Sequence, residues 1–267
     1  MNLHRSYLAL LAAFPLAAGS VAAADAAKKS QDIVSFGALR TTPSDEARNQ
    51  ALAWLKSVGK TDEATLKAFD AIWVQVDRSV LDRVTETLAL GDAEAARLLQ
   101  EARDLSGPAP TEVPAFLKDT RKPVFYRANL GLAYARALSQ RRVYEESLIA
   151  LKAAQPEQVV DPGAYLFHRA VAEHALLLKD EATRTIVRLL DDAVDVPDRY
   201  KMVSALMAFD MESWKQKDLG EIARKMDNIE RRLELARGGP HTQKIQKEVV
   251  LRLDEIIKKL ENQAKGS

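Results

Sequence analysis

The spacing of apolar residues constrains the fold of this chain most, because they recur at steps of three and four from residue 42 almost to the end. Such spacing places the apolar side chains on one face of an α-helix. The chain has 11 glycines and 10 prolines, which largely fall between the periodic segments rather than inside them. No segment after residue 42 favours a sheet. The sequence therefore predicts an all-α protein.

Turn and cap signals divide this pattern into separate helices. Pro43 suits the first turn of one helix, Gly59 closes it and Thr61 caps the next. The unbroken spacing over 66–88 predicts that this second helix is continuous. Further helices are expected at 93–104, 124–139, 142–154, 163–178, 180–193, 198–216, 219–237 and 242–262.

A pattern of small residues over 124–193 recurs at a step of 35 residues, from Ser147 to Ala182. The residues that carry it are Leu130, Gly131, Tyr134, Ser147, Leu151, Ala170, Ala182 and Ile186. They resemble the tetratricopeptide-repeat family, although Arg127 stands where that family has tryptophan. The resemblance implies an α-solenoid, an array of tetratricopeptide-like α-α hairpins in which small residues let two helices pack closely. The tail from residue 165 is similar to that of uncharacterised exported bacterial helical proteins.

The resemblance also implies a concave partner-binding face made by the first helix of each hairpin. The matching positions in this chain are Phe125, Leu132, Arg136, Phe167, Val171 and His174. Their apolar members would hold side chains of a protein or peptide partner, and Arg136 would be an exposed charge that pairs with a carboxylate. The alternative is that these residues pack against the preceding helices.

The carboxy-terminal part carries the spacing of a coiled-coil seam. Its residues are Leu219, Ile222, Met226, Ile229 and Leu233, followed after a Gly-Gly-Pro turn by Val250, Leu253, Ile257 and Leu260. Two seams joined by a short turn predict an antiparallel coiled-coil hairpin. We expect each seam to bury the other or to dock on the repeats, which favours a monomer. The alternative is that the seam joins copies into a homo-oligomer.

The breaks between these patterns predict the domain organisation of the chain. We expect a signal peptide at 1–24, a flexible lead-in at 25–41, a helical region at 42–104, a Pro-rich linker at 105–123, tetratricopeptide-like repeats at 124–217 and the coiled-coil hairpin at 218–262. The linker contains four prolines and is interpreted as a loop or hinge.

The first residues and the overall composition bound the location of the protein. A basic start with Arg5, the apolar run Tyr7–Ala18 and Ala22–Ala24 are typical of a cleavable secretory signal. We therefore expect export to the periplasm or cell envelope, with no membrane insertion of the mature chain. The absence of cysteine excludes lipoprotein acylation and thiol chemistry. The near balance of 39 basic and 38 acidic residues argues against nucleic-acid binding.

The histidine pair in "FHRAVAEH" is the one candidate for a zinc site in the sequence. His168 and His174 are six residues apart, so they point roughly 120° apart around a helix and do not share one ion. The aspartates at 191, 192, 195 and 198 match no EF-hand loop. We expect no metal site and no cofactor.

Motifs for catalysis are missing from the sequence: it has no G-x-S-x-G elbow, no S-x-x-K and no phosphate-binding glycine loop. The sequence thus favours a non-enzymatic scaffold or adaptor that binds another protein or a peptide. Two alternatives remain open: a structural oligomer built through the coiled coil, and an envelope hydrolase that uses scattered carboxylates, since such acids need no local motif.

Overall fold

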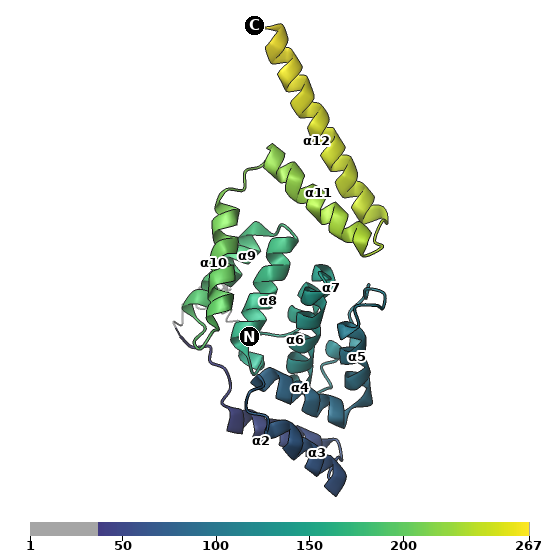
Figure 1. Ribbon diagram of the computed structural model, residues 1–267, viewed down its shortest axis with the longest axis vertical. Coiled ribbons are helices and arrows are strands. Elements are labelled where there is room, and N and C mark those ends of the chain that lie inside the picture. Colours follow the sequence, from purple (N-terminus) through teal and green to yellow (C-terminus); the bar gives the residue numbers. More distant parts are fainter. Residues whose placement is uncertain (1–36, 267) are drawn as a thin grey trace, which may run out of the picture. The chain divides into compact units, whose positions relative to one another are not determined.

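The computed structural model describes residues 37–266 (Figure 1). Within them the chain forms eleven α-helices and two short 3-10 helices, with no strand beyond one isolated bridge. The prediction of an all-α protein is thus confirmed for the described part. The predicted signal peptide at 1–24, and the lead-in up to residue 36, lie outside these residues.

The amino-terminal helices are α2 (Ser44–Ser57), α3 (Glu63–Trp73), α4 (Val80–Gly91) and α5 (Ala93–Arg103). The prediction of a continuous helix over 66–88 is wrong, because α3 and α4 are separated by a turn. Val74 and Val76 in this turn are 75% and 84% exposed. Ser79 starts α4 by accepting a hydrogen bond from the backbone N–H of Asp82 at 3.1 Å. The apolar spacing continues across this turn, but the Ser79 cap starts a new helix there.

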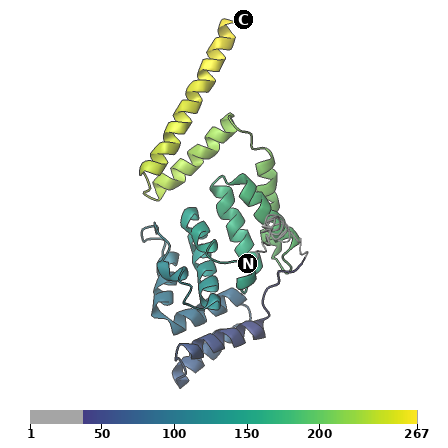
Figure 2. The same ribbon diagram turned by 180° about the vertical axis from the view of Figure 1, so that it is seen from behind.

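Two helical hairpins follow (Figure 2): α6 (Val124–Gln140) with α7 (Tyr144–Leu151), and α8 (Pro162–Ala175) with α9 (Lys179–Asp191). Short 3-10 helices η1 (Ala115–Leu117) and η2 (Pro156–Gln158) precede them. Small residues do lie where the first pair meets: the buried Ser147 hydroxyl donates to the Ala135 carbonyl at 2.9 Å. This contact lets α6 and α7 approach closely.

The turns of the two hairpins share one backbone conformation. Arg142 after α6 and Leu177 after α8 have positive φ angles of 60° and 61°. In each turn the next residue donates a backbone hydrogen bond to the carbonyl five residues earlier, from Val143 to Leu138 and from Leu178 to Glu173. Arg142 and Leu177 are 35 residues apart, so the sequence step is repeated in the backbone.

The chain ends with α10 (Asp198–Glu212), α11 (Leu219–Glu234) and α12 (Pro240–Lys265). Helix α10 packs against α8 and α9, whereas α11 and α12 pack against each other. The cores differ in extent: one large buried cluster runs from α2 to α9, and the α11–α12 pair has a separate cluster formed by Ile222, Ile229 and Val249.

Two connecting segments are held against the helices. Before α2, the Leu39 N–H donates to the Asp192 carbonyl at 2.9 Å, which fixes this strand-like segment to the end of α9. In the proline-rich segment 105–123, Leu117 is 1% exposed and Arg141 of the α6–α7 turn donates to the Gly107 carbonyl at 2.7 Å. This segment therefore packs on the body of the protein.

Candidate functional site

Three of the predicted partner-binding residues, Phe125, Leu132 and Arg136, lie on α6, a helix that packs against α4. Leu132 is 1% exposed, and Phe125 is partly buried against the large core. Arg136 forms an ion pair with Asp82 of α4. Arg136 is therefore not the exposed charge that the resemblance implied, because the preceding helices cover this face of α6.

The other three, Phe167, Val171 and His174, lie on α8 and are covered by α10. The Phe167 ring stacks on Tyr200 with centroids 3.9 Å apart, and Val171 packs against the cluster that contains Met207 and Met211. His174 Nε2 lies 2.9 Å from an Asp210 carboxylate oxygen. The six residues thus pack between helices rather than lining one open groove. The residues on α8 are covered by α10, which follows α8 in the chain, and not by a preceding helix.

The two histidines of α8 have separate environments. His168 is 7% exposed, and neither of its ring nitrogens has a hydrogen-bond partner within residues 37–266. Burial lowers the pKa of His168 to about 4, and the positive charges of Arg136 and Arg199 contribute. In the described residues no group of three or more His, Asp or Glu side chains is arranged to hold a metal ion.

His174 belongs to a small cleft of about 350 Å³. The Asp210 carboxylate lies beside His174 and also accepts a hydrogen bond from Trp214 Nε1 at 2.9 Å. The Arg224 guanidinium stacks over the Trp214 ring, 4.8 Å from its centroid. A His–Asp pair provides a base, but no Ser or Thr lines the cleft as described. The arrangement holds α8 and α10 together through the contacts of His174 and Trp214 with Asp210.

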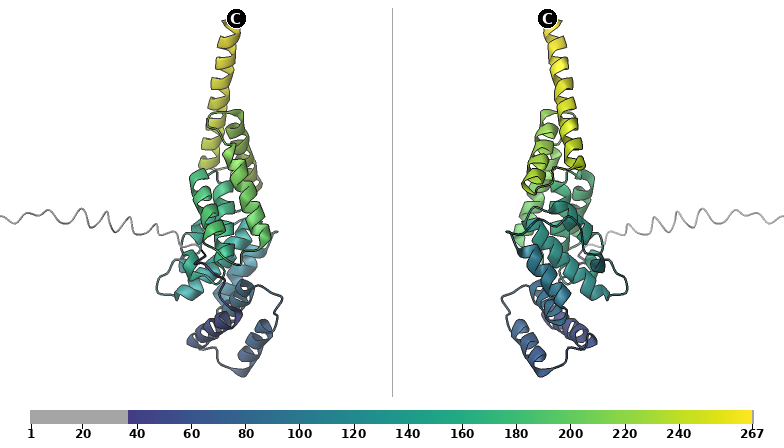
Figure 3. Two further views of the ribbon diagram at one scale, coloured as in Figure 1. Left: turned by 90° about the vertical axis from the view of Figure 1, so that its left-hand side faces the viewer. Right: turned by 90° about the vertical axis from the view of Figure 1, so that its right-hand side faces the viewer.

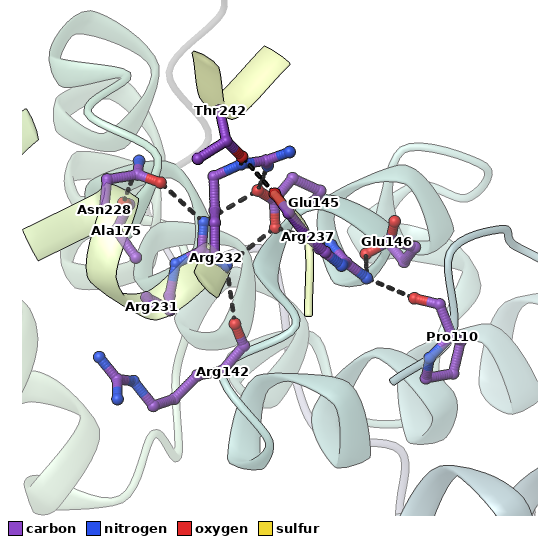
Figure 4. Close-up of polar contacts among 10 residues, drawn as sticks. All are labelled: Pro110, Arg142, Glu145, Glu146, Ala175, Asn228, Arg231, Arg232, Arg237 and Thr242. Carbon is purple, nitrogen blue, oxygen red and sulfur yellow. Dashed lines mark hydrogen bonds and ion pairs between the residues drawn. The ribbon is translucent and has the colours of Figure 1, made fainter. Parts of the chain in front are cut away.

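A group of charged side chains joins α7 to the last turn of α11 and to the turn that follows it (Figure 4). We call it the arginine cluster: Arg231, Arg232 and Arg237 around Glu145 and Glu146. Arg231 donates both terminal nitrogens to the Glu145 carboxylate, at 2.8 and 2.9 Å. Arg237 bridges the two glutamates, 3.3 Å from Glu145 and 2.9 Å from Glu146. A bidentate ion pair fixes the relative orientation of its two side chains in addition to stabilising their charges.

Backbone carbonyls complete the arginine cluster. Arg231 also donates to the Arg142 carbonyl at 2.9 Å, in the turn after α6. Arg237 donates to the Pro110 carbonyl of the segment 105–123. The cluster therefore docks the α11–α12 pair on both the first hairpin and the proline-rich segment (Figure 4).

Burial alone would raise the pKa of Glu145, because it disfavours the carboxylate. The hydrogen bonds and charge of Arg231, followed by the charge of Arg232, outweigh that effect and hold the pKa of Glu145 at about 2. Sequence reasoning missed this site. The signal that was present is the charge match between the adjacent acids Glu145-Glu146 and the adjacent bases Arg231-Arg232.

An apolar stripe lies on the exposed side of α10. We call it the α10 outer face: Met202, Val203, Leu206 and Phe209, which are 66%, 40%, 65% and 73% exposed. Its members recur at helical steps, and the opposite side of α10 buries Met207 and Met211 against α8 and α9. Single exposed apolar residues are common, but a continuous stripe indicates a contact surface.

The predicted coiled-coil seam is divided by the structure. Ile222 and Ile229 are 4% and 9% exposed and face α12, whereas Leu219, Met226 and Leu233 are 65%, 53% and 48% exposed. Two of these exposed residues, Met226 and Leu233, line a groove of about 730 Å³, here named the hairpin groove. Its apolar lining consists of Met226, Ile229 and Leu233 from α11 with Val249 and Val250 from α12.

No family model matches this chain, and neither a curated protein nor a solved structure matches it. Across residues 37–266 no helix is both long enough and apolar enough to span a membrane.

Proposed function

We propose that this protein is an exported, non-enzymatic helical-repeat scaffold that binds another protein of the bacterial cell envelope through the α10 outer face. The observation that carries the proposal is the stripe of four exposed apolar side chains on α10. A helix of a partner with its own apolar face is the complement of such a stripe, because both surfaces leave water together.

The shared turns of the two hairpins support a tetratricopeptide-like interpretation. In such an array α10 is the first helix of a third hairpin, and the second helix of that hairpin would pack on its outer face. The next helix in this chain, α11, is instead held on α7 by the arginine cluster. The α10 outer face is therefore left open to a helix from another molecule.

The test is a pull-down from the envelope fraction with Leu206→Asp/Phe209→Asp in the full chain. We expect this variant to lose a partner that the wild type retains, at unchanged helicity and melting temperature, since both side chains are largely exposed. Val76→Asp is the matched control, because Val76 is 84% exposed in the α3–α4 turn. Equal recovery of all partners by both variants would contradict the proposal.

Export is tested separately by amino-terminal sequencing of the protein recovered from the envelope. The signal-like run before Ala24 predicts a mature chain that begins near Asp25. A recovered protein that still begins at Met1 would contradict the export part of the proposal.

A second candidate, a structural oligomer, is favoured by a different observation. Half of the coiled-coil seam remains exposed beside the hairpin groove. The two candidates are compatible, since they use different helices.

A further inference from the structure

We infer that the hairpin groove is filled by the free end of α12 from a second copy of this chain, so that two copies assemble about a two-fold axis. The free end is defined as residues 257–265. This inference concerns α11 and α12 only, and it is independent of partner binding by α10.

The free end of α12 extends past its neighbour α11 (Figures 1 and 3). Arg252 donates a hydrogen bond to the carbonyl of Lys217, two residues before α11 begins, and Ile256 still packs against the core between α11 and α12. Beyond it, Ile257 and Leu260 are 51% and 58% exposed. A helix that continues into solvent with apolar residues at coiled-coil spacing has an unpaired seam.

The spacing along α12 selects one antiparallel register. Val250, Leu253, Ile257 and Leu260 follow each other at steps of three, four and three. Two antiparallel copies of α12 pair all four residues when Val250 faces Leu260 of the other copy and Leu253 faces its Ile257. The two-fold axis then lies midway between 253 and 257, and each copy makes the same contacts.

This register places the free end of each copy along the hairpin groove of the other, because Val249 and Val250 belong to the groove lining. Leu260 of the second copy then contacts Val250, and Met226 and Leu233 flank it from α11. Apolar side chains that are about half exposed in one copy thus become buried in both.

The charges of the two surfaces are complementary. The rim of the groove is acidic, with Asp227, Glu230 and Glu234 from α11. The free end is basic, with Lys258, Lys259 and Lys265 against Glu261. Glu234 pairs with Arg142, whereas Asp227, Glu230, Lys258 and Lys259 form no ion pair in the part of the chain that is described. A second copy brings the two unpaired sets together.

The first experiment tests the register with engineered cysteines, since the chain has none of its own. Val250→Cys/Leu260→Cys is expected to form a reducible disulfide-linked dimer. The two positions are ten residues apart in one helix, about 15 Å, so they do not link within a chain. Leu251→Cys/Leu260→Cys is the control and is expected to stay unlinked. No dimer, or equal linking of the control, would overturn the proposed register.

The second experiment is sedimentation of the full chain over a dilution series. We expect a wild-type dimer and a folded monomer for Ile257→Asp/Leu260→Asp, whose substitutions lie beyond α11. Leu251→Asp, 64% exposed on another side of α12, is the control and is expected to remain a dimer. A wild type that is monomeric throughout, or an aspartate variant that stays dimeric, would show that the free end does not join the copies.

The third experiment exchanges charges between the copies. Asp227→Lys/Glu230→Lys and Lys258→Glu/Lys259→Glu each place like charges together in a homodimer, and we expect roughly tenfold weaker association for each. Mixing the two variants restores opposite charges at both grooves, so a heterodimer of near wild-type affinity is expected. No preference for the heterodimer would rule out the free end as the occupant of the groove.

Discussion

Helices α6 and α12 have apolar residues at similar spacing, but their burial is opposite. Twelve of the 17 residues of α6 are buried, against two of the 26 in α12. The body around α6–α9 is held by apolar packing on several sides. The α11–α12 pair is held by a cluster of three buried residues and by the arginine cluster. Periodicity shows that a helix has an apolar face, whereas burial depends on how many neighbours surround it.

The largest expected effect tests the packing of the body. Tyr165 is fully buried, and its hydroxyl donates to the carbonyls of Leu151 and Ala154 at 3.0 and 2.9 Å. Tyr165→Ala is expected to lower the free energy of unfolding by about 3–5 kcal/mol in chemical denaturation. Tyr165→Phe keeps the ring and is expected to cost about 1–2 kcal/mol, since the carbonyls of Leu151 and Ala154 lose the hydroxyl hydrogen bond. If both variants lose the same free energy of unfolding, the hydroxyl and not the packed ring makes the larger contribution to stability.

Removal of the Glu145 charge tests the docking of the hairpin. Glu145→Gln leaves three arginines without their shared carboxylate, at an expected cost of about 3 kcal/mol. The effect is expected to be local, so amide hydrogen exchange should increase in α11 while α8 stays protected. Glu234→Gln is the control, because its pair with Arg142 is half exposed and contributes under about 1 kcal/mol. Uniform exchange in both helices would contradict local undocking.

Acid is expected to weaken the two regions in different pH windows. His168 is neutral in the fold, with a pKa of about 4 instead of 6.5, so its contribution is complete above pH 6.5 and is lost as the pH falls to about 4. This loss amounts to at most about 3 kcal/mol, and His168→Phe should remove it. The pKa of Glu145 is about 2, so docking should persist to about pH 4.5 and be lost between there and about 2. Thermal unfolding and amide hydrogen exchange, measured between about pH 7 and 2, distinguish the two pH windows. Loss of stability and of docking in one shared window would contradict the assignment of the windows to His168 and Glu145.

The smallest expected effect concerns the core of the hairpin. Ile229 is 9% exposed, in a cluster whose other buried members are Ile222 and Val249. Ile229→Ala is expected to cost about 2 kcal/mol, at the low end for a buried aliphatic, because the site is open to the groove. If two copies pair, the melting temperature of the wild type also rises with concentration. A loss near that of Tyr165→Ala would show that the hairpin is as tightly packed as the body.

Local signals predicted much of the fold and little of the candidate site. Gly59, Asp92 and Asp218 mark helix ends that the structure has, because caps act within one turn. The turn before Ser79 was not predicted, because the apolar spacing continues across it and is a stronger sequence signal than a single serine cap. At the predicted groove, Leu132 and Arg136 lie on the predicted helix, but Leu132 is buried in the core and Arg136 pairs with Asp82 of α4. Spacing along one helix carries no information about which other helix lies on it.

Apart from the break between α3 and α4, the sequence by itself determined the helices, since caps and helical period are properties of neighbouring residues. Only the tertiary structure decided which apolar faces are covered. Glu145 contacts Arg231 across 86 positions in the chain, and this contact holds α11 on α7. Within residues 37–266 the α10 outer face and the exposed half of the seam stay exposed. Contacts so distant in sequence depend on the packing of the whole body, which no local pattern encodes.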